Sequence, residues 1–175
     1  MSQKFNNVKI NFAPGPHTRS ESMDGRDYIV APMVMLTEGV HNGSSGPVLY
    51  TAAELQKTPE VWNMKPLVVY HPQKDGQGVS ACSQDIIDSQ GVGVIMNTKW
   101  DGKLRAEAWF DIEKTKRVDD RIINALEKGE MMEISTGLYT DDEIKAGCFE
   151  ATGEKYDSIA HNLSLIHISE PTRPY

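Results

Sequence analysis

The chain has 175 residues, of which 39% are hydrophobic and 25% charged, and its formal net charge is -7. This size and composition are typical of one globular domain that buries its own core. A nucleic-acid-binding surface needs concentrated Lys and Arg, which this acidic chain lacks, and no run approaches the roughly 18 apolar residues of a membrane span. We therefore expect neither a nucleic-acid-binding nor a membrane protein.

The cysteines and the first residues bear on the cellular compartment. Cys82 and Cys148 stand in no CxxC or Cys/His cluster, which argues against a disulfide framework and against zinc. The first residues contain no apolar segment of the kind found in secretion signals. We expect a cytoplasmic setting and no metal or organic cofactor.

The N-terminal third begins with an unstructured segment. Residues 1–27 are polar and broken by prolines and glycines, which predicts a flexible N-terminal arm. The first strong strand signal is at residues 28–36, where Pro32 indicates an edge or a bulge. Residues 38–47, rich in glycine and serine, predict a loop in which His41 is a solvated histidine rather than a ligand.

A short helix and a buried strand follow. Residues 51–57 begin with capping-box spacing, in which a threonine and a glutamate satisfy the free amides of a helix start. The apolar run at residues 65–70 predicts a buried strand that ends at His71, directly before Pro72. The polar residues 72–90 predict a long loop that flanks a cleft.

The clearest local pattern is a hairpin. Apolar residues alternate through residues 92–112 on both sides of Asp101-Gly102, which suits a type I′ turn. Apolar residues at helical spacing from Val118 to Leu126 then predict a core helix, which Gly129 ends as its C-cap. That helix returns the chain to a strand at residues 133–139.

The last part of the chain falls into three segments. Residues 141–154 are acidic and turn-rich, which predicts an exposed hairpin or loop rather than a metal site. Residues 156–162 predict a last strand, which carries His161. Residues 163–175 look like the translation of a sequencing-library adapter, so we expect them to be foreign and the natural protein to continue beyond them.

The candidate site is the pair Ser135 and His71. Ser135 stands in an apolar segment directly before Thr136-Gly137, and His71 ends a buried strand. A serine becomes a nucleophile when a neighbouring base takes its proton, and histidine is the usual base. In an arbitrary protein, a serine followed by a glycine in a strand is more often a packing residue. Further motifs therefore have to support the hypothesis.

Four motifs in a fixed order resemble tailed-phage proteins of the DUF2213 type, which are similar to prohead maturation proteases and, more remotely, to herpesvirus assemblin serine proteases. The motifs are Lys-Pro-Leu-Val-Val-Tyr-His-Pro, the Gly-Val-Gly-Val to Trp-Asp-Gly-Lys-Leu-Arg-Ala-Glu-Ala hairpin, Glu-Lys-Gly-Glu to Glu-Ile-Ser-Thr-Gly-Leu-Tyr, and Tyr-Asp-Ser-Ile-Ala-His-Asn-Leu. The resemblance extends from Tyr28 to Leu163. It implies a prohead-protease-like domain at residues 28–162 that lacks its C-terminal end.

The resemblance also implies a catalytic order of His, Ser and then a second His or an acid, which His71, Ser135 and His161 follow. His71 would act as the base, and the third group would orient it. Asp157 is a lesser alternative to His161. The phage relatives usually carry a histidine a few residues after the Asn-Leu pair, and His167 stands near that position inside the suspected adapter segment. We expect His167 to stand there by accident of the adapter reading frame, so the rival to His161 as third group is a residue missing from this sequence.

The sequence as a whole predicts a mainly β (α+β) fold, a closed or partly closed barrel of about six or seven strands with two or three flanking helices. The resemblance implies a serine endopeptidase that cleaves phage scaffold and capsid protein and itself, inside the prohead in the host cytoplasm, with a possible homodimer. The alternative is a non-catalytic phage structural or scaffold-associated module with the same fold. A bacterial esterase is disfavoured because no Gly-x-Ser-x-Gly elbow is present.

Overall fold

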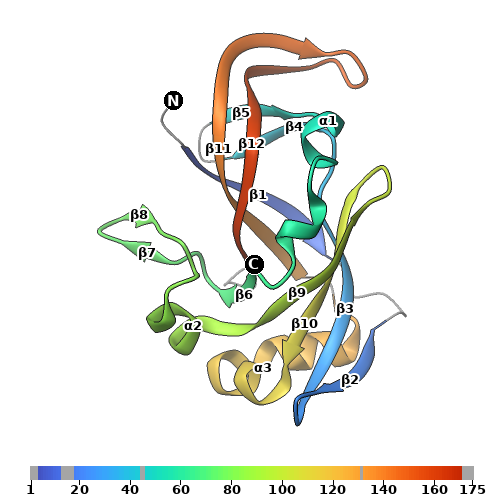
Figure 1. Cartoon of the computed structure of the whole chain (residues 1–175), viewed down its shortest axis with the longest axis vertical. Helices are drawn as coiled ribbons and strands as arrows, with labels where there is room; N and C mark the ends of the chain where they lie inside the picture. The colour runs from blue at the N-terminus through green and yellow to red at the C-terminus, as the bar shows by residue number, and fades with distance from the viewer. Residues whose placement is uncertain (1–3, 13–17, 44–45, 131, 171–175) are drawn as a thin grey trace.

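The computed structural model describes residues 4–12, 18–43, 46–130 and 132–170 (Figure 1). Its elements in chain order are β1 (Lys4–Phe12), β2 (Arg19–Met23), β3 (Arg26–Leu36), β4 (Gly39–Gly43), β5 (Gly46–Tyr50), α1 (Ala52–Leu55), the 3-10 helix η1 (Pro59–Trp62), β6 (Pro66–Val69), β7 (Gln73–Lys74), β8 (Gln77–Gly78), α2 (Gln84–Gln90), β9 (Gly91–Trp100), β10 (Leu104–Asp111), α3 (Ile112–Lys128), β11 (Met132–Phe149) and β12 (Glu154–Glu170). Among the described residues, no helix is long and apolar enough to span a membrane.

One large sheet organises the molecule. Its strands are hydrogen-bonded in the order β1-β11-β12-β6-β9-β10-β3-β2, and the β4–β5 hairpin joins it through β5, which pairs with β12. Neighbouring strands are antiparallel except where β12 pairs with β5 and β6. The prediction of a mainly β fold with two or three helices is confirmed. The sheet has more strands than expected because segments predicted as arm and loop also form strands.

The prediction of a closed or partly closed barrel is wrong as to closure, because the sheet does not close on itself in the described part of the chain. In the described part of the chain, β1 and β2 end the path and do not pair with each other. β3 approaches β1 and β11 without forming a ladder to either. The contact there includes a side-chain hydrogen bond, which the Thr136 hydroxyl donates to the Met35 carbonyl over 3.0 Å. Side-chain packing therefore replaces the backbone pairing that closure would need.

The predicted hairpin is present as β9 and β10, and α3 packs against β3, β9 and β10 (Figure 1). Its connection differs from a type I′ turn, since three residues separate the paired Trp100 and Leu104, and Gly102 adopts the left-handed conformation. The core helix starts earlier than predicted, at an Asp111 N-cap that accepts a hydrogen bond from the Lys114 amide. It ends at the predicted left-handed Gly129.

The prediction of a flexible arm at residues 1–27 is also wrong for the residues that the structure describes. β1 pairs with β11 along its whole length, and β2 pairs with β3. The polar composition is misleading because a polar side chain of this segment can be buried and hydrogen-bonded: the Asn6 amide nitrogen donates to Thr140 Oγ1 over 2.7 Å. Residues 13–17 lie outside the described residues.

β12 continues to Glu170 and therefore includes most of the suspected adapter segment. Leu165 and Ile168 are buried in the core cluster. Residues 171–175 lie outside the described residues. The foreign origin of residues 163–175 stays a prediction, but the structure assigns positions 163–170 to a strand between β11 and β6.

Candidate active site

The predicted strand around Ser135 is confirmed as the first half of β11. Side chains alternate across a strand, so Ser135, Gly137 and Tyr139 share one face, and Ile134, Thr136 and Leu138 share the other. The second set lies in the core, where Ile134 and Leu138 are almost completely buried. Ser135 is only 4% exposed, although it points to the opposite face. Other parts of the chain must therefore cover that face.

His71 reaches this face from the end of β6. Its Nδ1 lies 2.9 Å from Nε2 of His167, which is completely buried on β12. His167 stands opposite Gly137 in the β11–β12 ladder. A Cβ added at Gly137 would lie 2.7 Å from His167 Nε2. The His167 ring therefore lies over the Gly137 backbone, on the same face of the sheet as Ser135.

Aromatic side chains enclose one end of the His71–His167 pair. The Phe5 ring lies with its centroid 6.4 Å from that of His71 and 6.2 Å from that of His167, and it also contacts Tyr139. Gly78 at the end of β8 packs directly on Phe5, where an added Cβ would overlap the ring. Residues 72–90, for which the sequence predicts a loop, contain the β7–β8 hairpin and α2. Through Gly78, β8 covers the Phe5 ring.

Burial keeps both histidines neutral near pH 7. It lowers the pKa of His71 to about 4, with a further contribution from the charge of Lys9. Burial likewise lowers the pKa of His167 to about 3, assisted by His71. A neutral imidazole has one donor and one acceptor nitrogen. If His71 Nδ1 donates to His167, Nε2 of His71 is left as an acceptor, which is the state that a general base requires.

Ser135 and His71 do not form a hydrogen bond in the structure. Ser135 Oγ is buried without a hydrogen-bond partner in the described part of the chain, and so is Nδ1 of His167. Catalytic hydrogen bonds often tighten only when substrate binds. The face therefore holds a buried hydroxyl and a neutral imidazole pair. A movement of the face is needed before Ser135 Oγ can form a hydrogen bond with His71.

An ion pair borders Ser135 on the side away from Phe5. Lys9 stands opposite Ser135 in the β1–β11 ladder, and its Nζ lies 3.0 Å from Glu133 Oε1. Sequence reasoning missed Lys9 and Phe5, because both belong to the predicted arm. Alternation of apolar and polar residues within residues 8–12, which includes Lys9 but not Phe5, was the available signal.

The structure does not bring His161 to this site. Its two ring nitrogens lie 3.2 Å from carboxylate oxygens of Glu54 and Glu143. His167 lies six positions after His161 on β12, which is roughly 20 Å along a strand. The hydrogen bond to Glu54 raises the pKa of His161, opposite to the shift of His71. Asp157, the lesser alternative, is exposed near Gly46.

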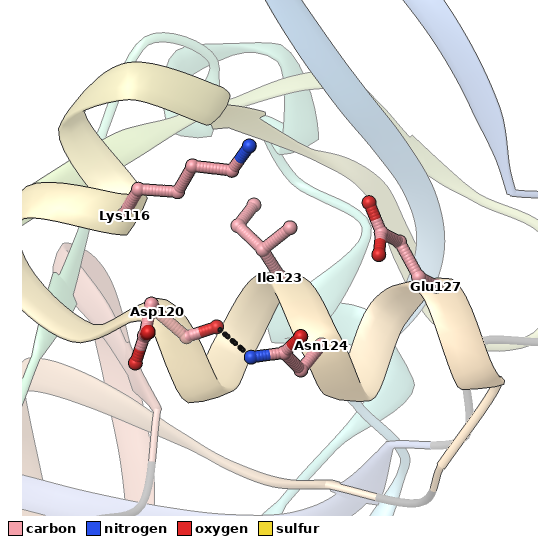
Figure 2. A pocket seen from close by; sticks show the side chains of 5 residues that line it. All are labelled: Lys116, Asp120, Ile123, Asn124 and Glu127. Atoms are coloured by element: carbon pink, nitrogen blue, oxygen red, sulfur yellow. Dashed lines mark hydrogen bonds between the residues drawn. The ribbon is translucent and has the colours of Figure 1, made fainter.

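Other parts of the described chain offer less chemistry. No group of three or more His, Cys, Asp or Glu side chains is arranged to hold a metal ion among the described residues. A surface hollow of about 270 Å³ lies along α3 (Figure 2). It is lined by one helix that packs on β3, β9 and β10, apart from the strands that carry Ser135 and His167, and its lining residues are Lys116, Asp120, Ile123, Asn124 and Glu127.

Comparisons with known proteins support the fold. No family model matches the chain, and no curated protein matches its sequence. The solved structure of the bacteriophage T4 capsid assembly protease, gp21, is similar with a TM-score of 0.61. The similarity covers 95% of this chain and 98% of that chain at 10% sequence identity. The chain therefore has the fold of a phage capsid assembly protease.

Proposed function

We propose that this protein is a serine endopeptidase of phage head assembly, of the DUF2213 type, which cleaves scaffold and capsid proteins and itself within the prohead. The observation that carries the proposal is the shared face of Ser135 and the neutral His71–His167 pair, in a fold similar to that of a capsid assembly protease. Fold similarity alone leaves the activity open. The chemistry of this face is what favours an enzyme.

Each residue has a role in the proposed reaction. Ser135 Oγ attacks the peptide carbonyl while its proton passes to Nε2 of His71, because Nδ1 of His71 is engaged with His167. His71 then gives this proton to the leaving amine, and the acyl-enzyme ester is hydrolysed by a water that His71 activates in turn. Peptide binding has to shift the face enough to bring Oγ to His71.

The third group belongs at the β12 position opposite Gly137. His167 fills that position in this sequence and bonds to His71, whereas His161 bonds to two carboxylates roughly 20 Å away. The assignment concerns the position in the strand. Resequencing the gene to its natural end shows which residue the natural chain places there, and a histidine or an acid is expected.

The proposed partners follow from the proposed substrates. Capsid and scaffold proteins are substrates inside the assembling head, and a homodimer is part of the same proposal. The proposed reaction needs only side chains, so no resident metal or organic cofactor enters it.

The deciding experiment uses the gene resequenced to its natural end and co-expressed with its neighbouring capsid and scaffold genes. Mass spectrometry compares the wild type with Ser135→Ala and with Ser158→Ala, a control serine that is also buried but lies on the far part of β12. We expect discrete cleavage products in the wild type and the control that vanish in Ser135→Ala. Equal products in all three, or none from a folded wild type, would overturn the proposal.

A non-catalytic structural module is the second candidate, and one observation favours it: the Ser135 hydroxyl is buried without a hydrogen bond to a base. A fluorophosphonate probe, which reacts with activated serines, separates the two. Labelling of the wild type that is lost in Ser135→Ala supports the enzyme. If the protein is a structural module, it stays unlabelled, and the wild type and Ser135→Ala are incorporated into phage heads equally well.

A further inference from the structure

The end of β6 poses a problem of orientation. Leu67 and Val69 point into the core cluster, so Val68 points to the opposite face. The ladders agree, because Val68 pairs with position 169 of β12, which in turn pairs with Ser135. If β6 simply continued, the next side chain would fall on the Ser135 face, and that of His71 would fall on the core side.

Tyr70 reverses this alternation. Its φ is 69°, in the left-handed region, and its side chain is 45% exposed. One left-handed residue turns the strand direction, so the following residue no longer obeys the period of two. As a result His71 reaches the face that holds Gly137 and bonds to His167. The buried Pro72 then fixes the backbone on the far side of His71.

A left-handed conformation is unfavourable for a residue with a large side chain, so surrounding contacts must maintain it. Arg121 of α3 interacts with the Tyr70 side chain as well as with Asp119, its main partner. Asp119 is the residue at which α3 leaves helical geometry, with φ -158° and ψ 101°. Arg121 donates to Asp119 Oδ1 through both its backbone amide and its Nε. At the kink of α3, the Arg121 guanidinium is thus paired with Asp119 and also interacts with Tyr70.

We propose that Tyr70 is a positioning residue: its left-handed backbone, supported by the Arg121–Asp119 pair at the kink of α3, places the His71 imidazole on the Ser135 face. The consequence for cleavage rests on the function proposed above. The geometric claim does not, because the His71–His167 contact is measurable in a protein without activity.

The first test varies the backbone preference at position 70 in the full-length chain. Glycine and asparagine tolerate positive φ, whereas β-branched valine resists it, so Tyr70→Gly and Tyr70→Asn should preserve the site and Tyr70→Val should disrupt it. The matched control is Met64→Val. Met64 also has a positive φ, 63°, is 60% exposed and lies two positions before β6, so it controls for strain alone.

The main readout is the NMR titration of the histidine side chains. In Tyr70→Val, we expect His71 to separate from His167 and to titrate near the ordinary pKa of about 6.5. In Tyr70→Gly, Tyr70→Asn and Met64→Val, both rings should keep their lowered pKa values. In an active protein, Tyr70→Val should lower kcat about 100-fold with little change in KM, since a general base contributes roughly 10²- to 10⁴-fold. An intact His71–His167 pair in folded Tyr70→Val would overturn the proposal.

A second pair of variants decides the matter if Tyr70→Val does not fold. Arg121→Ala removes the side chain that supports Tyr70 but leaves the tyrosine itself. In the wild-type background it should therefore shift the titration of His71 toward the ordinary pKa of about 6.5. In a Tyr70→Gly background the same change should have no effect, because glycine needs no support. Equal effects of Arg121→Ala in both backgrounds would contradict the mechanism.

The two proposals fail in different ways. One result is a protein that cleaves nothing, while the His71–His167 contact is kept in Tyr70→Gly and Tyr70→Asn and lost in Tyr70→Val. That result would remove the protease function and keep the positioning role of Tyr70. Cleavage that depends on Ser135 but is indifferent to Tyr70→Val would do the reverse.

Discussion

Two histidines on the same strand lie in opposite environments. His167 is completely buried and bonds to another imidazole, and its pKa is lowered to about 3 by burial. His161 lies between the carboxylates of Glu54 on α1 and Glu143 on β11, and the bond to Glu54 raises its pKa.

The difference shows what a histidine needs in order to act as a base. A ring held between two carboxylates is stabilised in its charged form, which has no lone pair to offer. Burial beside a neutral ring keeps the lone pair available near neutral pH. Of the two regions, only the His71–His167 pair therefore has the protonation state that proton abstraction requires.

The largest effect that separates the two regions is on cleavage. We expect His71→Ala to lower kcat/KM by roughly 10²- to 10⁴-fold, because it removes the proposed base, and His167→Ala by a smaller factor. His161→Gln should leave cleavage within about twofold, since its ring nitrogens bond to Glu54 and Glu143, away from His71. Product formation by mass spectrometry measures all three. A loss in His161→Gln as deep as in His71→Ala would erase the distinction and return His161 to the site.

A methyl group added to β11 tests the same contrast through packing. In Gly137→Ala the new Cβ would meet the His167 ring at 2.7 Å, and we expect a loss of about 2–3 kcal/mol of stability together with displacement of the ring. The matched control is Gly147→Ala on the same strand, where the Cβ meets the hydroxyl end of Tyr156, a side chain that can swing away. Urea unfolding measures both. Equal losses would show that the His167 ring is as free to move as the Tyr156 ring.

Sequence patterns predict the local parts of this molecule well. The apolar run that ends at His71, the β9–β10 hairpin, the helix that ends at Gly129 and the strand around Ser135 are all present. Each rests on periodicity or capping within a short segment, which the residues of that segment determine. These segments include both residues of the original site hypothesis.

Pairing between strands that are far apart in the sequence determines the other parts of the fold. A local pattern does not specify which strand is the partner or in which register it pairs. The polar segment at residues 4–12 becomes a strand because β11 offers it a hydrogen-bonding edge. Which residue of β12 faces His71 depends on the register of Gly137 with His167, and irregularities between β11 and β12 shift that register. The left-handed Tyr70 is equally invisible, because glycine or asparagine would be the usual choice there.

The pH dependence of stability gives a smaller but more specific contrast. The folded pKa values of His71 and His167 lie below that of an unfolded histidine, so the unfolded chain binds more protons as the pH falls from 6.5. Stability should therefore decline on acidification, by roughly 3 kcal/mol between pH 6.5 and 5, about half of it from each ring. His167→Asn removes one titrating group and should flatten this decline, whereas His161→Gln should keep it. Urea unfolding across this range decides, and an unchanged decline in His167→Asn would contradict the assignment of buried neutral rings.

His161 should produce the smallest effect, with the opposite sign. Its folded pKa is raised by Glu54, so its stabilising contribution is complete below the unfolded value of about 6.5 and is lost as the pH rises through the folded value. The ring is partly exposed, so solvent screening limits the contribution to a few tenths of a kcal/mol. The wild type should exceed His161→Gln in stability at pH 5.5 and match it at pH 8.5 in urea unfolding. A difference that instead grows toward pH 8.5 would mean that His161 stabilises the hairpin as a neutral ring, and the contrast between the two histidines would then rest on burial alone.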